Sequence, residues 1–314
     1  MKKKISIICP CYNEEEALEL FIKKIKKIFL ESLTNYDYEL IFVDDCSKDK
    51  SESILRGISK LEKNCKVIFN AKNYGPLKSC FNALKYCTGD AIIPMLPVDM
   101  QDPPELLYEF VQKWEQGFDV VHGIKKERDE NWFYKKIRNF YYLLVEKISN
   151  TNIPPYVGEY QLIDKKINDL LKEFDDYYPY TRGIISSLSS NTTSVNYTWQ
   201  RRKTGKSNMN IMKLIDLGLN GIISFSNFPI RIFTLIGFLI SLTSFLFIIL
   251  QILTYFFTDR MLIPGISIMI VSIFFFSGIQ FLFFGILGEY IYAIHGQVRK
   301  PPKYVIEKEK INID

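Results

Sequence analysis

The chain has 314 residues, with 40 lysines and arginines against 35 aspartates and glutamates, which gives a net charge of +5. This length allows one α/β domain and a smaller module. So small a charge suits an anionic membrane surface or a phosphorylated substrate, and we expect no nucleic-acid partner. All six cysteines fall between Cys9 and Cys87, and in a cytosolic domain we expect reduced core thiols rather than disulfides or metal ligands.

The first part of the chain alternates strand-like and helix-like segments. Apolar runs and apolar residues at helical spacing predict strands at 5–9, 39–43, 66–69, 91–96 and 120–123, and helices at 14–30, 51–61 and 78–86. This alternation is typical of βαβ units and a parallel sheet, whose ligands bind at the carboxyl ends of the strands. Polar residues follow three of the predicted strands, at Tyr12–Glu14, Asp44–Asp45 and Asp99–Asp102.

Two further segments, residues 133–148 and 211–222, carry apolar residues at helical spacing. Basic residues are interleaved in the first of them. Such helices either pack on the core of the domain or lie in a membrane interface, and the sequence leaves both interpretations open.

Two long apolar runs follow. Residues 232–257 and 261–288 contain no Asp, Glu, Lys or Arg, and each run exceeds the roughly 20 residues that a helix needs to cross a bilayer. A buried helix pair of a soluble protein is the alternative, but such helices are shorter and carry a polar face. The short connection between the runs predicts a transmembrane hairpin with both ends on the same side.

The flanks of this hairpin predict its orientation. Cations occur where the positive-inside rule places them, at Arg231, Arg299, Lys300 and Lys303. Residues 1–8 lack the pattern of a signal peptide, so we expect the first domain in the cytoplasm and the hairpin in the inner (cytoplasmic) membrane. The expected organisation is a catalytic domain with juxtamembrane helices at 1–228, two transmembrane helices at 229–292 and a cytoplasmic tail at 293–314, loose from Lys303 onward.

Acidic and amide side chains after the fourth predicted strand are candidate metal ligands. Asp99 and Gln101 present oxygens two residues apart, and Mg²⁺ or Mn²⁺ prefers oxygen and bridges to diphosphates. The alternative is an acidic turn before a helix, with Glu105 in the first helical turn. The spacing alone does not decide between them.

Basic residues complement this acidic segment. Lys125 and Arg128 follow the predicted strand at 120–123, and Arg201 and Arg202 precede Gly205. Arginine holds phosphate through paired hydrogen bonds, whereas the alternative for each residue alone is a solvated loop.

Three motifs follow predicted strands: Cys9-Pro10-Cys11-Tyr12-Asn13-Glu14, Val43-Asp44-Asp45-Cys46-Ser47 and Asn73-Tyr74-Gly75. Together they resemble the nucleotide-binding half of a family 2 glycosyltransferase with the GT-A (Rossmann-like) α/β fold. A fourth motif narrows the resemblance to the dolichyl-phosphate-mannose synthase-like branch, the polyprenyl-phosphate glycosyltransferases; it is Asp99-Met100-Gln101-Asp102-Pro103-Pro104-Glu105. Later matches are Tyr160–Asp164, Arg182-Gly183, Arg202-x-x-Gly205 and Leu287–Ile291.

The resemblance implies roles for the matching positions. Nucleotide-sugar contacts are implied for Pro10, Tyr12, Glu14, Asp44, Asp45, Lys125, Arg128 and Arg202. Asp99 and Gln101 would hold the divalent metal. Asp164 would act as a base or orient the acceptor.

The chain also departs from the pattern of this branch. Pro97 stands where an acid usually begins an Asp-x-Asp pair, so metal dependence is in doubt. Other residues stand where cations are usual, namely Gln161, Trp199 and Asn208, while Lys125 replaces an arginine. These changes are expected to weaken metal or diphosphate binding, or to alter the donor.

The expected function is inverting transfer of a sugar from a nucleotide donor to polyprenyl phosphate, most simply undecaprenyl phosphate in a bacterium. A catalytically degenerate membrane partner that binds nucleotide sugar or lipid is the main alternative, and Pro97 favours it. A processive polysaccharide synthase lacks support because no Gln-x-x-Arg-Trp sequence occurs. A transporter would need more intramembrane polar residues than Gln251 and Gln280. The sequence leaves open the sugar and the oligomeric state, including a homo-oligomer.

Overall fold

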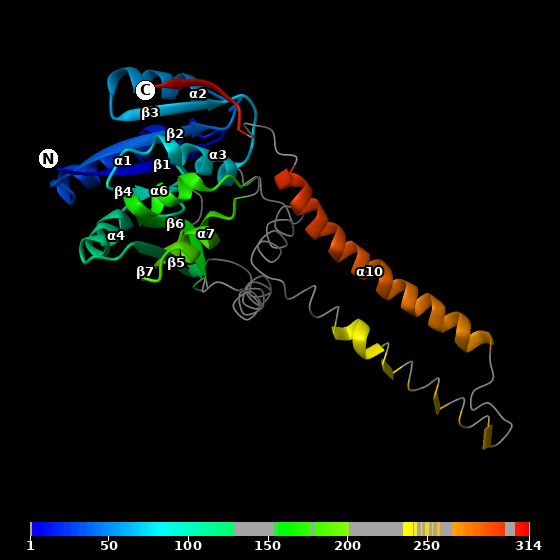
Figure 1. Cartoon of the computed structure of the whole chain (residues 1–314). Helices are drawn as coiled ribbons and strands as arrows, with labels where there is room; N and C mark the ends of the chain where they lie inside the picture. The colour runs from blue at the N-terminus through cyan, green and yellow to red at the C-terminus, as the bar shows by residue number, and fades with distance from the viewer. Residues whose placement is uncertain are drawn as a thin grey trace. The chain divides into compact units, whose positions relative to one another are not determined.

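The structure is a computed structural model (Figure 1). It describes residues 2–128, 154, 156–176, 179–200, 235–240, 266–298 and 305–313, with scattered positions between 242 and 257. The chain divides into two compact units, one of residues 1–221 with 300–314 and one of residues 222–299. The amphipathic helices predicted at 133–148 and 211–222 lie outside the described residues.

The described strands of the first unit form an eight-stranded mixed sheet in the order β7-β5-β6-β4-β1-β2-β3-β8. They are β1 (Lys3–Cys11), β2 (Tyr36–Asp44), β3 (Cys65–Asn70), β4 (Ala91–Ile93), β5 (Val120–Arg128), β6 (Val157–Asp164), β7 (Thr192–Trp199) and β8 (Glu307–Ile311). β6 runs antiparallel to both of its neighbours, β4 and β5, and β8 runs antiparallel to β3. The other neighbouring strands are parallel, so six strands end at one edge, which we call the carboxyl edge.

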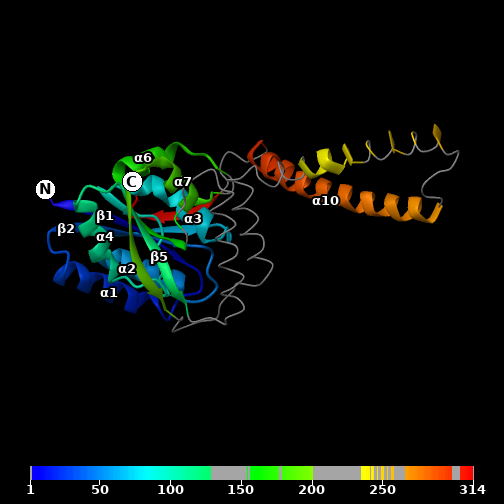
Figure 2. The same ribbon diagram turned by 90° about the horizontal axis from the view of Figure 1, so that it is seen from below.

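Helices cover both faces of this sheet (Figure 2). One face carries α1 (Leu18–Glu31), α2 (Ser51–Leu61) and α4 (Leu106–Glu115). The other carries α3 (Pro76–Ala83) with the 3₁₀ turn Leu84–Tyr86, α6 (Lys165–Glu173) and α7 (Thr181–Leu188). The apolar residues predicted to line one side of α1 are buried, and alternate residues of β1 pack in the same core. The α/β class and the predicted βαβ alternation are confirmed.

Among the element boundaries that differ from the prediction, two have a clear local reason. The strand predicted at 91–96 ends at Ile93, because Pro94 has no N–H to donate to the next strand. The helix predicted from residue 14 begins at Leu18, after a turn in which the N–H groups of Ala17 and Leu18 both donate to the carbonyl oxygen of Glu14.

The expectation of a loose tail from Lys303 is wrong for the end of the chain. Residues Glu307–Ile311 form β8, which pairs with β3 (Figure 1, red strand beside β3). The amide of Asn312 donates to the carbonyl oxygens of Ser59 and Cys65 at 2.8 and 2.9 Å. A charged composition suggested disorder, but an edge strand buries little side-chain surface and tolerates charges on its open face.

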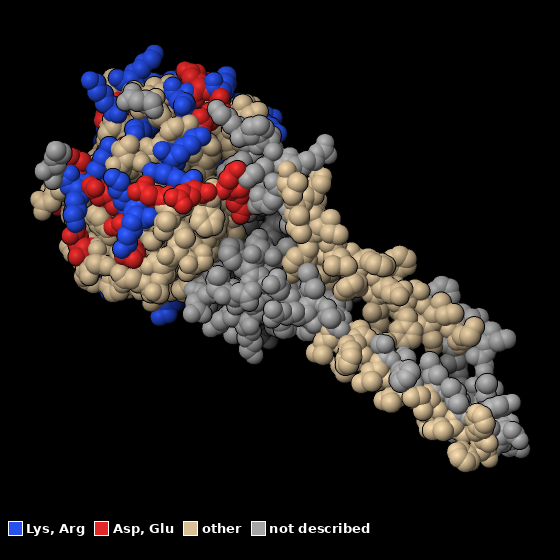
Figure 3. Space-filling view, in the orientation of Figure 1, with Lys and Arg blue, Asp and Glu red and all other residues tan. Residues whose placement is uncertain are grey.

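The second unit contains α10 (Ile266–Val298), a helix of 33 residues. Its window Phe275–Tyr292 is long and apolar enough to cross a membrane and is not buried within the protein; it is the one such helix among the described residues. Large apolar side chains on it are exposed, including Phe275, Phe281 and Phe284. On the face shown in Figure 3, charged side chains cover the first unit, whereas the described part of the second shows none.

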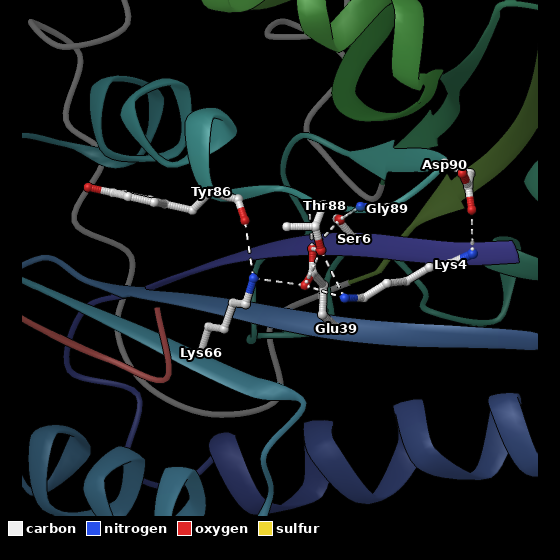
Figure 4. A network of polar contacts seen from close by, with 8 residues as sticks. All are labelled: Lys4, Ser6, Glu39, Lys66, Tyr86, Thr88, Gly89 and Asp90. Atoms are coloured by element: carbon white, nitrogen blue, oxygen red, sulfur yellow. Dashed lines mark hydrogen bonds and ion pairs between the residues drawn. The ribbon is translucent and has the colours of Figure 1, made fainter. Parts of the chain in front are cut away.

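A buried carboxylate joins β1, β2 and β3 near their amino ends, together with the turn that precedes β4 (Figure 4). Glu39 of β2 is 1% exposed and accepts hydrogen bonds from Ser6 and from the backbone N–H of Thr88. The ammonium groups of Lys4 and Lys66 each lie 2.9 Å from its Oε2. Burial alone would raise the pKa of Glu39, but these donors lower it to about 2.

This network predicts a pH-dependent stability. The pKa of Glu39 is about 2 in the fold against 4.5 in the unfolded chain, so its contribution is complete above pH 4.5 and is lost as the pH falls toward 2. The difference corresponds to roughly 3 kcal/mol of unfolding free energy. Thermal unfolding between about pH 6 and pH 2 should show wild-type stability falling across this window, with a lower and flatter profile for Glu39→Gln. A variant that keeps the wild-type slope would contradict this account.

Candidate active site

The loops after β1 and β2 are joined to each other at the carboxyl edge. The N–H of Asn13 donates to Ser47 Oγ at 2.9 Å, and the N–H of Glu14 donates to Ser51 Oγ at 2.9 Å. Asn13 is in the left-handed region, with φ of 56°, which turns the chain sharply after β1. These bonds hold the loop that carries three predicted donor residues, Pro10, Tyr12 and Glu14.

Asp44, the last residue of β2, is buried at the same edge. Its carboxylate accepts from the Ser47 hydroxyl and, at 3.1 Å, from the Ser47 N–H. Burial raises the pKa of Asp44, and the two Ser47 bonds offset part of that rise. An acceptor fixed at a strand end suits the N–H or hydroxyl groups of a nucleoside. Its place in the base and ribose pocket stays a prediction.

Asp45 organises the loop that follows β3. Its carboxylate accepts four hydrogen bonds of 2.7–3.0 Å, from the side chains of Asn70 and Ser79 and from the N–H groups of Tyr74 and Gly75. Gly75 has φ of 86°, which a residue with a side chain rarely adopts. Asp45 therefore shapes the Asn73-Tyr74-Gly75 motif, and its direct contact with a donor stays a prediction.

Asp99 and Gln101 lie in the turn between β4 and α4. The N–H of Gln101 donates to Asp99 Oδ1 at 3.2 Å, and its Nε2 donates to the carbonyl oxygen of Gln200 at 3.4 Å. Two oxygen-bearing side chains in one turn fit an ion that takes its other ligands from water and a diphosphate. Among the described residues, no group of three or more His, Cys, Asp or Glu is placed to hold a metal by itself.

Lys125, a predicted phosphate ligand, is paired with an acid in this structure. Its Nζ lies 2.9 Å from Asp102 Oδ1 and 5.6 Å from the centre of the Trp199 ring. The Tyr197 hydroxyl also donates to Asp102. Asp102 thus joins the turn after β4 to β5 and β7, and the contact of Lys125 with phosphate stays a prediction.

The two predicted arginines fall at the limits of the described chain. Arg128 ends β5, and its backbone pairs with Trp199 at the end of β7, so it lies at the carboxyl edge. Arg202 lies outside the described residues, two positions after Gln200. The roles of both in phosphate binding stay predictions.

One departure from the family pattern lies inside the sheet. Gln161 of β6 is buried, its Oε1 lies 2.7 Å from His122 Nδ1, and its Nε2 donates to the carbonyl oxygen of Gly158 at 3.1 Å. Through its Oε1 glutamine can accept a hydrogen bond from the His122 ring, which an arginine, having no acceptor atom, could not do.

The structure places Asp164 away from the carboxyl edge, and the catalytic role expected for it stays a prediction. Because β6 runs antiparallel to β4, its last residue pairs with Ala91, the first residue of β4, at the end of the sheet opposite the carboxyl edge. There Asp164 caps α6, accepting from the N–H of Lys166 at 3.0 Å, and it accepts from Trp114 Nε1 at 2.8 Å. The family resemblance that pointed to Asp164 does not give the direction in which β6 runs.

Glu159, the other acid of β6, lies at the carboxyl edge, where Asp164 was expected to lie. It lies near the start of β6, which is the end of that strand at the carboxyl edge. Its Oε1 is 3.5 Å from Arg182 Nε, and it lines a small cavity with Cys80, Pro94 and Thr181. Burial raises the pKa of Glu159, and Arg182 and Lys125 counter part of that rise. If the antiparallel direction of β6 had been known, the sequence would have pointed to Glu159, which lies near the start of that strand.

The donor-side loops, the acidic turn after β4 and an acid of β6 thus lie at one edge of an α/β sheet. The profile described as Glycosyl transferase family 2 matches residues 6–171, more than half of the chain. The chain belongs to glycosyl transferase family 2.

Curated relatives agree with this assignment. This glycosyltransferase is 35% identical to the bactoprenol glucosyl transferase of Shigella phage SfX, over 98% of this chain and 100% of the relative. It is 34% identical to the uncharacterized glycosyltransferase YkcC of Bacillus subtilis, over 96% and 93% of the two chains. The mannosyltransferase PcManGT of Pyrobaculum calidifontis, in complex with GDP-Man and Mn²⁺, is similar with a TM-score of 0.48 and 15% identity, over 71% of this chain and 63% of that one.

The two acids of β6 make matched variants for a test of the glycosyltransferase. Glu159→Gln should lower turnover by about 10²-fold, because it removes the carboxylate of β6 that lies at the carboxyl edge. Asp164→Asn should retain most turnover, because asparagine also caps helices and the residue lies at the opposite end. Sugar transfer by the two purified variants, with thermal unfolding as a folding check, measures both. If Asp164→Asn lowered turnover more than Glu159→Gln did, the catalytic role would belong to Asp164.

Proposed function

We propose that this glycosyltransferase transfers a sugar from a nucleotide donor to polyprenyl phosphate at the cytoplasmic face of a membrane. The observation that carries the proposal is similarity over nearly the whole chain to proteins named bactoprenol glucosyl transferases, at 34–35% identity over 97–98% of this chain. That similarity extends past the donor domain into the apolar segment. Glucose is therefore the first sugar to test, and undecaprenyl phosphate the first acceptor.

The connectivity of the chain supports a hairpin anchor. The first unit contains residues on both sides of the apolar segment, because β8 belongs to the same sheet as β1–β7. A segment that leaves a cytoplasmic domain and returns to it must cross the membrane an even number of times. Since α10 is long and apolar enough for one crossing, the apolar run at 232–257 supplies the second in this proposal.

The proposed reaction is an in-line displacement at the anomeric carbon with inversion. An oxygen of the acceptor phosphate attacks; with a second pKa near 6, a phosphate monoester is largely deprotonated at neutral pH and needs no strong base. The loops after β1 and β2 would hold the nucleoside, with Asp44 as hydrogen-bond acceptor. Glu159 and Arg182 would orient the acceptor, because they form the charged pair of β6 and α7 at the carboxyl edge. Catalysis then comes mainly from positioning.

A divalent ion would neutralise charge on the leaving nucleoside diphosphate. In this proposal Asp99 and Gln101 hold it, and their shared turn keeps the two side chains together. Pro97 removes one carboxylate that the branch usually supplies, so the ion would rely more on water and the diphosphate. We propose weak metal binding rather than loss of metal dependence.

The test is transfer from labelled nucleotide sugars to undecaprenyl phosphate by the full chain in detergent, with Mn²⁺, Mg²⁺ or EDTA. We expect one labelled lipid product, formed from UDP-glucose first, and its loss in EDTA. Asp99→Asn should raise the metal concentration required for half-maximal rate by about tenfold or more. Asp37→Asn, which changes an exposed acid near the start of β2, is the matched control and should leave that concentration unchanged.

Two results would overturn parts of this proposal. A product that forms equally well in EDTA would exclude the metal role of Asp99 and Gln101. Nucleotide binding without a lipid product from any donor would instead favour a degenerate binding partner.

A further inference from the structure

The end of the chain contacts the loop between β3 and α3, residues 71–75, which we call the donor loop. Ile306 uses both of its backbone groups there: its carbonyl oxygen accepts from the N–H of Ala71 at 2.8 Å, and its N–H donates to the Tyr74 hydroxyl at 3.1 Å. The Ile306 side chain itself is 55% exposed. The contact is therefore made by the backbone and does not serve to bury this side chain.

The donor loop is held from two sides. On one side, the carboxylate of Asp45 accepts from the N–H groups of Tyr74 and Gly75 at 3.0 and 2.7 Å. On the other side, Ile306 contacts Ala71 and the Tyr74 hydroxyl. Asp45 comes directly after β2, and Ile306 comes directly before β8. Removing either partner leaves the loop attached on one side only.

Further contacts fix β8 in the register that these bonds require. Glu307 accepts from Asn82 Nδ2 at 2.7 Å and from the Tyr86 hydroxyl at 2.6 Å, both just past the donor loop. Glu309 pairs with Arg56 of α2 through two bonds of 2.8 and 2.6 Å. Val305 is 3% exposed. The segment is docked on both sides of the position at which it contacts the loop.

We propose that the C-terminal strand β8, through Ile306, is a positioning element for donor binding: it holds the donor loop in the form that accepts the nucleoside diphosphate. This inference rests on the proposed function, because the donor loop carries the Asn73-Tyr74-Gly75 motif. Ile306 acts through Tyr74 and Ala71 and does not itself touch the substrate. Its N–H is the only group that the Tyr74 contact requires of it, so the residue type at 306 matters less than the presence of that N–H.

The test separates positioning from general stability with three variants of the full chain. Ile306→Pro removes the N–H that donates to Tyr74 and keeps the carbonyl oxygen that accepts from Ala71. Ile306→Val keeps both groups and serves as the conservative control. Glu309→Gln weakens the pair with Arg56, away from the loop. Binding of UDP and GDP, hydrogen exchange of a peptide covering residues 71–75, and Tm are measured for each.

We expect Ile306→Pro to weaken nucleoside diphosphate binding by about three- to tenfold and to speed exchange in the donor loop. Ile306→Val and Glu309→Gln should bind as the wild type does, even though Glu309→Gln lowers the Tm. The double variant Tyr74→Phe with Ile306→Pro should bind the nucleoside diphosphate no more weakly than whichever single variant binds it less tightly. Both substitutions remove the same hydrogen bond.

Each other outcome is decisive. If nucleoside diphosphate affinity followed the Tm across all variants, β8 would have only a structural role. The same would hold if Ile306→Pro kept the wild-type affinity and the wild-type hydrogen exchange in the donor loop. Additive losses in the double variant would show that Tyr74 contacts the donor independently of Ile306. Failure of the wild type to bind any nucleoside diphosphate would instead overturn the proposed function, and this inference with it.

Discussion

The direction of β6 decides which residues meet at the carboxyl edge. In an otherwise parallel run of strands, β6 lies between β4 and β5 and runs against both. Its first residue, Val157, therefore pairs with Ile124 of β5 on the side of the carboxyl edge, while its last residue lies beside the start of β4. This one reversal brings Glu159 to the edge that carries Asp44 and Asp99, and it leaves Asp164 to cap a helix at the opposite end.

The two ends of the sheet are built with different electrostatics. At the amino end, the buried Glu39 is neutralised by two lysines and joins β1, β2 and β3. At the carboxyl edge, the carboxylate of Asp45 is satisfied by amide, hydroxyl and backbone donors, and Lys125 is paired with Asp102. The charge pairs between strands hold the amino end of the sheet together. At the carboxyl edge, carboxylates that accept from loop N–H groups shape the loops where a ligand would bind.

Local patterns in the sequence were sufficient for most of the donor half. Apolar patterns placed α1 and the parallel strands β1 to β5, but not β7, and the positions of Asp44, Asp45 and Asp99 followed from strand ends. The errors concern long-range pairing. The expectation for Asp164 came from the family resemblance, which does not give the direction in which β6 runs, so the sequence could not show which acid of β6 lies at the carboxyl edge. The strand β8 pairs with a partner more than 200 residues earlier, and its charged residues resemble a solvated tail unless Arg56 and Asn82 are known to lie opposite.

The position of β8 after the apolar segment has a consequence for biosynthesis. β3 has an open edge from the time it leaves the ribosome until residues 307–311 emerge, because β8 is its outer neighbour. The roughly 100 residues between β7 and β8 take on the order of 5 to 20 s to translate. The apolar segment is made in that interval, so the sheet can be completed only after this segment has emerged. Completion of the sheet is thereby ordered after synthesis of the apolar segment, and a chain truncated within that segment would leave the β3 edge available for aggregation.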